Sequence, residues 1–369
     1  MLSLSRAQPF DTETFPGSYR EARERWLESL PDGAASDSHG VAGEAPGGGA
    51  LATDVAWLGP ADAAGVLVLI AGTHGVEGYA GSAVQNDLWR LYRAGRLALP
   101  DDVAIMAIHA LNPWGYAWDR RCDGEGIDVN RNFVDFSRPL PANPGYDSIR
   151  EVFAWADPRQ RAERLAAFRR EQGPTAFEIA VSGGQYCDPR GPFFGGRGDS
   201  HSRRVIEMLV DSRQLARRRL AVIDIHTGLG PYGYGEVICD HPPASGGART
   251  ARAWYGPSCT LPAEGTSSSV PKFGLLDYAW HRIMADDSCF ITLEFGTLGT
   301  DRLFEVLLDE NQGWARQPLA PPAESERLRL AALMRSHFYP DDDTWREAVL
   351  FRARQVITQA LGGLAVAAR

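Results

Sequence analysis

The feature that most constrains the fold of this chain is a series of short, largely apolar segments that end at clusters of polar residues. We expect these segments to be strands, at 55–58, 66–70, 103–110, 220–225, 237–239 and 290–295. Their apolar residues are mostly continuous rather than alternating, which is typical of a sheet that is buried on both faces. Helical patterns lie between and after them, at 80–93 and near 301–314, 323–337 and 343–361.

Strands that alternate with helices predict an α/β fold, built on a mostly parallel, doubly wound mixed sheet with helices on both faces. We expect residues 1–369 to form a single domain, with C-terminal helices from about 301. The stretch 32–49 is rich in glycine, alanine and serine, and it is expected to be a flexible surface loop. The segments 140–144 and 183–198 contain many turn-forming residues and are expected to run over the surface or along the edge of a site.

Composition and charge exclude several classes of protein. The chain is 44% hydrophobic and 23% charged, with a formal net charge of -9, so neither a disordered chain nor a nucleic-acid-binding protein is expected. No segment approaches the roughly 18 consecutive apolar residues that a membrane-spanning helix needs, so no membrane association is expected. The N-terminal segment lacks the apolar core of a signal peptide, and the five cysteines are widely spaced. We therefore expect a cytoplasmic protein without disulfides.

Two of the polar clusters contain residues that bind metals. The segment GTHGVEG follows the strand at 66–70 and places His74 three residues before Glu77, close enough for both side chains to bind one ion. His226 ends the strand at 220–225 and would add a third ligand, which leaves a position open for water, as in catalytic zinc sites. Each residue alone is more often an ordinary loop or core residue. Their occurrence at two strand ends of one sheet favours a metal site.

Two further clusters suggest catalysis and substrate binding. Glu294 lies within an apolar strand, where a carboxylate costs several kcal/mol unless it is paired or functional. It could take a proton from a metal-bound water, the alternative being a buried ion pair with an arginine. Beyond the strand at 103–110 the chain carries Arg120, Arg121 and Arg131. Arginine suits carboxylates and developing oxyanions, although a solvated run of charges is the simpler interpretation.

The order of these motifs resembles the zinc carboxypeptidase family. The likeness rests on GTHGVEGYAGS, LNPWGYAWDRR, GIDVNRNF, IDIHTGLGP and the later strand with its glutamate, and it is greatest to an uncharacterised bacterial branch of that family. The same clan includes the succinylglutamate desuccinylase and aspartoacylase enzymes. The resemblance covers about residues 55–300 and implies a Zn²⁺ cofactor held by His74, Glu77 and His226.

The resemblance also implies roles for other residues. Glu294 resembles the general base, which activates the zinc-bound water and then protonates the leaving amine. Arg121 resembles the arginine that stabilises the oxyanion, with Arg120 as the alternative if the register slips by one. Asn130 and Arg131 resemble the pair that grips a substrate carboxylate.

The resemblance extends to the surroundings of the site. Asp128 would orient a ligand histidine from outside the metal shell. The segment GLLDY resembles the pocket segment of these enzymes, and Leu276 within it would contact substrate. A tyrosine of digestive-type carboxypeptidases is missing, because its expected position falls within the serines at 267–269. The tyrosines that could replace it are Tyr186, Tyr232, Tyr234 and Tyr255.

These observations predict a zinc-dependent hydrolase that cleaves an amide or peptide bond next to a free carboxylate, as metallocarboxypeptidases do. Its substrate would be a peptide or small molecule that carries this carboxylate. The alternatives are an N-acyl amino-acid deacylase of the succinylglutamate desuccinylase or aspartoacylase type and a non-catalytic module that binds carboxylates. A peptidase needs an open cleft on the acyl side of the scissile bond, whereas a small-acyl deacylase closes it. The C-terminal stretches contain no β-rich cap like that of aspartoacylase-like enzymes, which favours the peptidase.

Overall fold

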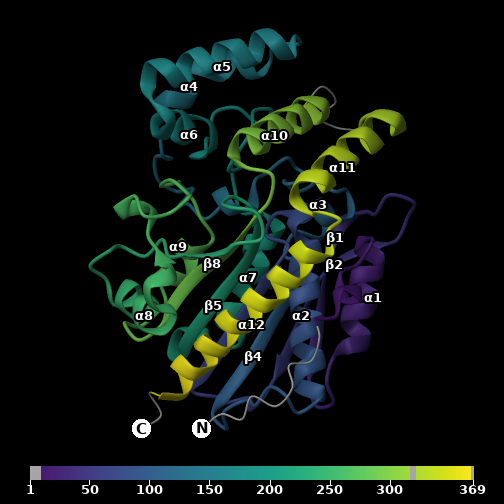
Figure 1. Cartoon of the computed structure of the whole chain (residues 1–369), viewed down its shortest axis with the longest axis vertical. Coiled ribbons are helices and arrows are strands. Elements are labelled where there is room, and N and C mark those ends of the chain that lie inside the picture. Colours follow the sequence, from purple (N-terminus) through teal and green to yellow (C-terminus); the bar gives the residue numbers. More distant parts are fainter. Residues whose placement is uncertain (1–9, 316–320, 367–369) are drawn as a thin grey trace.

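A computed structural model of the protein describes residues 10–315 and 321–366. Its centre is an eight-stranded sheet with the strand order β1-β2-β4-β3-β5-β8-β6-β7 (Figure 1). The strands are β1 (Ala35–Glu44), β2 (Ala50–Leu58), β3 (Gly65–Ala71), β4 (Val103–His109), β5 (Arg219–Gly228), β6 (Gly235–Ile238), β7 (Cys259–Thr260) and β8 (Cys289–Gly296). The six predicted strands are therefore all present.

The middle of the sheet is parallel and its flanks are antiparallel. Strands β4, β3, β5 and β8 are parallel neighbours, whereas β2 pairs antiparallel with β4, and β6 pairs antiparallel with β8. Strands β3 and β4 are buried along their whole length, as the continuous apolar segments predicted. The predicted α/β class, with a mostly parallel mixed sheet, is confirmed.

The prediction of a flexible loop at 32–49 is wrong. Within this stretch, β1 pairs antiparallel with β2 from Ala35 opposite Trp57 to Glu44 opposite Ala50, with one irregularity after Val41. Most of its side chains are exposed because β1 is an edge strand. Pairing through the backbone needs no apolar side chains, so a small, polar sequence can form this strand without the hydrophobic pattern that reveals the others.

Helices cover both faces of the sheet, as predicted. One face packs against α1 (Tyr19–Ser29), α2 (Gly78–Arg93), α8 (Gly246–Tyr255) and α12 (Asp343–Val366), with Trp26, Trp89 and Trp345 buried in the shared core. The other face packs against α7 (His201–Ser212) and α9 (Asp277–His281). No helix in the described ranges is both long enough and apolar enough to cross a membrane.

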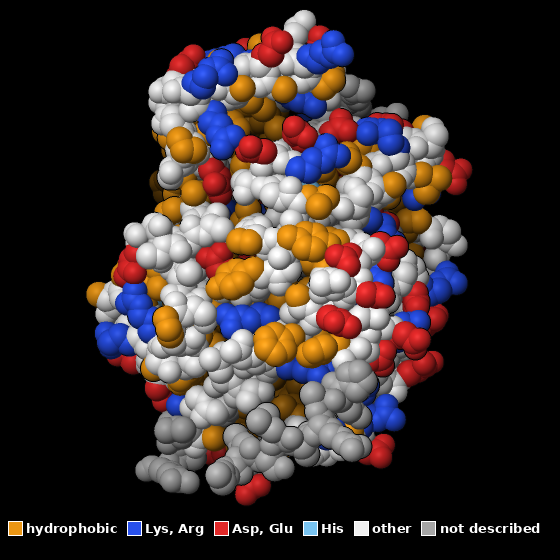
Figure 2. All heavy atoms as spheres, in the orientation of Figure 1, with side chains coloured by type: hydrophobic (Ala, Val, Ile, Leu, Met, Phe, Trp, Pro, Cys, Tyr) orange, Lys and Arg blue, Asp and Glu red, His pale blue; other side chains and the backbone are white. Residues whose placement is uncertain are grey.

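A third layer of helices has a core of its own. It contains α4 (Pro144–Phe153), α5 (Pro158–Gln172), α6 (Pro174–Ser182), α10 (Thr300–Ala315) and α11 (Glu324–Phe338), which lie beyond one end of the sheet (Figure 1). A short helix, α3 (Pro113–Ala117), follows β4. A groove of about 780 Å³ separates α5 from α10 and α11, and Figure 2 shows apolar side chains in this hollow. The three predicted C-terminal helices are α10, α11 and α12.

Candidate active site

The candidate site forms where β3, β5 and β8 end. After β3 the chain passes through His74 into a single 3₁₀ turn, Gly75–Glu77, and then into α2. A side chain at Gly75 would lie 1.9 Å from the carbonyl carbon of Gly115, so only glycine allows this close approach. The tight turn brings the side chains of His74 and Glu77 to the same point.

The strands β5 and β8 supply the opposite wall. Successive side chains of a strand point to opposite faces, so Asp224 and His226 face the site while Ile225 packs in the core. Glu294 of β8 is the direct neighbour of His226 in the parallel ladder and also faces the site. The register between β5 and β8 therefore places the carboxylate of Glu294 beside His226.

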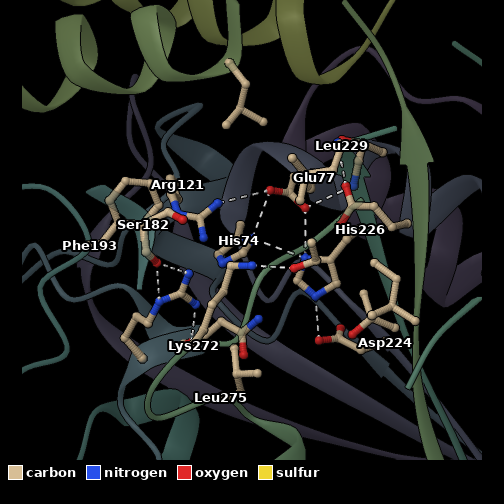
Figure 3. A pocket seen from close by; sticks show the side chains of 18 of the residues that line it. His74, Glu77, Arg121, Ser182, Phe193, Asp224, His226, Leu229, Lys272 and Leu275 are labelled. Carbon is tan, nitrogen blue, oxygen red and sulfur yellow. Dashed lines mark hydrogen bonds and ion pairs between the residues drawn. The ribbon is translucent and has the colours of Figure 1, made fainter. Parts of the chain in front are cut away.

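Two histidines and one carboxylate converge at the centre of the site (Figure 3). The Nδ1 atom of His74 lies 2.9 Å from Glu77 Oε1, and the Nδ1 atom of His226 lies 3.0 Å from Glu77 Oε2. The two Nδ1 atoms are 3.2 Å apart. All three side chains are at least 96% buried, since their exposed fractions are 4%, 2% and 2%.

The Nε2 atoms of both histidines face carboxylates. This contact determines which ring nitrogen carries the hydrogen, and therefore whether the Nδ1 atoms can bind a metal. His226 Nε2 lies 2.6 Å from Asp224 Oδ2, and His74 Nε2 lies 3.3 Å from Asp128 Oδ1. Hydrogens on both Nε2 atoms leave both Nδ1 atoms as acceptors that point at each other and at Glu77. Three acceptors at this separation repel one another unless they share a cation. The donor set therefore fits a divalent metal such as Zn²⁺.

Positively charged side chains of the site stabilise the ionised forms of Glu77 and Asp128. Burial by itself would raise the pKa of Glu77, but without a metal the positive charges of protonated His74 and His226 and their hydrogen bonds to Glu77 lower it well below its usual value. Burial likewise opposes charge on Asp128, but Arg121, Arg131 and His74 hold its pKa well below the usual range. Both carboxylates are therefore ionised at neutral pH.

Glu294 behaves differently. Burial, and then the nearby charge of Glu77, raise the pKa of Glu294 to about 7. Its Oε1 atom accepts a hydrogen bond from the backbone N–H of Leu229 at 2.9 Å, which fixes the carboxyl group in the pocket. A carboxylate with this pKa can both accept and return a proton near neutral pH.

The structure distinguishes Arg121 from Arg120. Arg121 lines the pocket, with Nε 2.9 Å from Asp128 Oδ2 and an Nη atom 3.6 Å from Glu77 Oε1. Arg120 does not reach the site, so its assignment to substrate binding is corrected. It pairs with Glu310 of α10, and its guanidinium lies 4.2 Å from the ring centre of Trp314. Adjacent residues of this loop point in opposite directions.

Asn130 and Arg131 line the same pocket. The guanidinium of Arg131 is 1% exposed and donates to the carbonyl oxygens of Ser182 and Asn130. Asn130 Oδ1 accepts from the backbone N–H of Leu276 at 2.8 Å. The side chain of Leu276 lies in the core of the sheet face instead of the pocket, so its assignment to substrate contact is also corrected. Its neighbour Leu275 lines the pocket.

None of the four candidate tyrosines lines the pocket within the described part of the chain. Tyr186 donates to the carbonyl oxygen of Arg131, and Tyr255, the last residue of α8, is buried in the core. Tyr232 and Tyr234 are 47% and 46% exposed. The serine that stands in the expected segment, Ser269, does line the pocket.

Sequence reasoning missed several residues of this site. Asp224 lies two residues before His226 on the same strand. Residues at this spacing point to the same face, so the sequence could have indicated that Asp224 contacts His226. Lys272, Asp240 and Asp277 also line the pocket, but they come from separate segments with no common pattern.

The pocket is small and covered. Its free volume is about 80 Å³. Apolar side chains of the third layer cover the metal-binding residues, and these are Leu303, Phe304, Leu307 and Phe338. The segment 183–198 has no helix or strand, as predicted, and contributes Phe193 to the wall.

Several solved structures are similar to this chain, each with a TM-score below 0.5. Carboxypeptidase A from Helicoverpa armigera is 15% identical over 86% of this chain and 73% of that one, with a TM-score of 0.42. Succinylglutamate desuccinylase from Chromobacterium violaceum is 17% identical over 83% and 80%, with a TM-score of 0.39. Murein-tripeptide amidase from Escherichia coli O157 is 19% identical over 85% and 95%, with a TM-score of 0.36. The first two belong to the groups that the motifs resemble.

The comparison with curated proteins finds no match. A sequence profile described as "protein of unknown function (DUF2817)" matches residues 15–352, which is most of the chain. The protein therefore belongs to the DUF2817 family.

Proposed function

We propose that this protein is a metal-dependent hydrolase that cleaves an amide bond next to a free carboxylate. The observation that carries the proposal is the convergence of His74, Glu77 and His226 in one covered pocket, with Glu294 beside them. When bound there, Zn²⁺ would act as a Lewis acid and lower the pKa of a bound water. A non-catalytic binding module would have no use for a buried glutamate at this place.

The chain's own residues would divide the remaining work. Glu294 takes a proton from the attacking water and passes it to the leaving amine, for which a pKa of about 7 is suited. Arg121 lies on the same wall as Glu77 and donates hydrogen bonds to the oxyanion that forms on the carbonyl oxygen.

Arg131 would bind the free carboxylate. Its hydrogen bonds go to uncharged carbonyl oxygens, and no carboxylate lies within 4.0 Å of it among residues 10–315 and 321–366. A buried cation that no carboxylate contacts is costly, because the more distant charge of Asp128, which is paired with Arg121, replaces only part of the attraction of water. A substrate carboxylate would supply the missing charge, with Asn130 alongside.

The small pocket favours the deacylase over the peptidase. Leu303, Phe304 and Leu307 of α10 line the pocket beside His74, Glu77 and His226, and they limit the room for a long acyl group there. An N-acyl amino acid with a short acyl group fits such a space better than a peptide does. We therefore propose short N-acyl amino acids as the preferred substrates.

Metal content and hydrolysis of N-acetyl amino acids, measured together, test the proposal. We expect close to one zinc ion per chain, and little in His74→Ala, with activity lost in parallel. N-acetyl amino acids should be hydrolysed faster than dipeptides, and their C-terminal amides should be poor substrates because Arg131 then has no partner. His39→Ala, a change on the edge strand β1, serves as the control. A folded native protein that binds no added zinc would refute the proposal.

A further inference from the structure

A second group of charged side chains lines the pocket beside the metal-binding residues. It consists of Asp240, which follows β6, of Lys272, and of Asp277 at the start of α9. These residues take no part in the proposed chemistry. They line the same pocket as Arg131, so a substrate whose carboxylate binds Arg131 would extend past them.

One oxygen of the buried Asp277 carboxyl group has no hydrogen-bond partner among the described residues. The residue is 3% exposed, and the oxygen in question is Oδ1. Its Oδ2 atom lies 4.0 Å from His281 Nε2. That histidine is neutral near pH 7, because burial and the adjacent His241 lower its pKa to about 3. Asp277 therefore faces the pocket without a cation of its own.

Asp240 is in a similar position. Its half-buried carboxylate makes no hydrogen bond or ion pair with the part of the chain that the structure covers. Burial raises the pKa of Asp240 to about 6, and burial followed by Asp240 raises that of Asp277 well above its usual value. Lys272 and Arg131 offset this rise only in part, and no lysine or arginine of the described residues lies within ion-pair distance of either carboxylate.

Lys272 does not pair with either carboxylate. Its Nζ atom donates to Ser269 Oγ and to the carbonyl oxygen of Val270, and it has no carboxylate within 4.0 Å in the described ranges. Burial, and then the charge of Arg131, lower its pKa to about 8. Lys272 and Arg131 are therefore neighbouring cations, which suits the α-carboxylate of a substrate and leaves the two aspartates unpaired.

We propose that the leaving amino acid carries a primary amine on its side chain, and that Asp277 and Asp240 bind this ammonium group. The α-carboxylate lies at Arg131, and the side chain extends from there toward α9. The inference rests on the proposed function and specifies its substrate class. The competing arrangement is a leaving amino acid with an acidic side chain that binds Lys272. The experiment below distinguishes the two arrangements.

The experiment compares three substrates of equal acyl group: Nα-acetyl-lysine, Nα-acetyl-norleucine and Nα-acetyl-glutamate. We expect kcat/KM for the lysine compound to exceed that for norleucine by about 10-fold or more, since a charged hydrogen bond contributes roughly 1.5–3 kcal/mol. In Asp277→Asn and in Asp240→Asn this ratio should fall toward one. Asp101→Asn, an exposed change before β4, should keep the native ratio. Two variants are used because Asp277 is buried, and thermal unfolding checks that each folds.

Two outcomes would overturn the inference while the hydrolase survives. These are a native preference for norleucine or glutamate, or a lysine preference that neither aspartate variant reduces. Binding of the free amino acids by calorimetry separates the two proposals. If nothing is hydrolysed but lysine binds at least 10-fold more tightly than norleucine, and Asp240→Asn abolishes the difference, the proposed function fails and the pocket assignment stands.

Discussion

At the scale of single residues, the two histidines of the site are held in the same way. Each turns one ring nitrogen toward the shared point and the other toward a carboxylate, Asp224 for His226 and Asp128 for His74. Asp224 is itself fixed by the hydroxyl of Thr73, which donates to Oδ1 at 2.7 Å. Such partners hold the ring orientation and make the ligand nitrogen a better donor to metal.

Asp224→Asn should therefore weaken zinc binding without removing a ligand. We expect the Kd for zinc to rise about 10- to 100-fold, as is usual when a partner of this kind is lost. Titration against a zinc-sensitive dye measures the change. Asp286→Asn, whose side chain is 87% exposed, provides the control. An unchanged Kd would mean that Asp224 only fills space under the ring.

Glu294→Gln should separate metal binding from turnover. The amide keeps the shape and can still accept from Leu229, but it cannot take a proton. We expect full zinc content with kcat lower by about 10²- to 10⁴-fold. Elemental analysis and a progress curve on the same sample check both. Turnover within a few-fold of the native protein would assign the base to another group.

The sequence predicted the positions of the candidate metal ligands better than those of the residues around them. His74, Glu77 and His226 each adjoin an apolar strand, and parallel strands bring their carboxyl ends to one edge. Arg120 and Leu276 were misplaced because each lies in an irregular segment, where neighbouring residues differ in direction without a period. Asp240, Asp277 and Lys272 could not be grouped in advance, since only the folded chain brings their segments together.

At the scale of elements, α10 determines the size of the pocket. Leu303, Phe304 and Leu307 line the site on one side and join the third core on the other. The helix is attached to the loop that follows α3, because Arg120 of this loop pairs with Glu310 and its guanidinium lies over the ring of Trp314. If the proposed function is right, the position of α10 limits the length of the acyl group that the pocket accepts.

Leu307→Ala should enlarge the acyl end of the pocket. We expect the ratio of kcat/KM for butyryl over acetyl amino acids to rise about 10-fold, in line with the 1–3 kcal/mol that a methylene contributes in an apolar pocket. Leu330→Ala on α11 is the matched control, because Leu330 is 1% exposed but does not line the site. Both variants should lose about 2–5 kcal/mol of stability. If the Leu307→Ala and Leu330→Ala variants have the same acyl preference, α10 does not determine which acyl group is accepted.

Elements differed in how far the sequence revealed them. The inner strands were predicted because burial on both sides leaves a continuous apolar signal, and α2 was predicted because its apolar residues recur at helical spacing. Strand β1 was predicted as a loop because its exposed side chains carry no such signal. An edge strand such as β1 forms because its backbone pairs with the neighbouring strand, and the composition of the segment alone does not reveal this pairing.

At the scale of the whole molecule, buried histidines couple stability to pH. His109 is fully buried, stacks on Trp26 at 5.1 Å between ring centres and lies 2.8 Å from Ser82 Oγ. Burial lowers the pKa of His109 from 6.5 to about 4. The folded state is therefore favoured by this residue above pH 6.5. Between pH 6.5 and 4 only the unfolded chain takes up the proton, and this part of the stability is lost.

His109→Asn should show this dependence directly. At pH 7.5 the variant should be less stable than the native protein, because the stacking and the contact with Ser82 are lost. The difference should shrink by about 3 kcal/mol as the pH falls to 4, since each pH unit changes the free energy by about 1.4 kcal/mol. Urea unfolding at several pH values measures it. A difference that stays constant would show that His109 titrates alike in both states.

The pocket takes its parts from two hydrophobic cores, and this has an evolutionary consequence. The residues proposed to bind metal and to transfer protons lie at the carboxyl ends of β3, β5 and β8, whereas the cover comes from the helical third layer. Mutations in the cover can accumulate without disturbing the reaction centre, so selection can alter what the protein accepts while its chemistry is inherited intact. Duplicated copies of this gene are thus expected to drift apart first in α4–α6 and α10, and last at the ends of β3, β5 and β8.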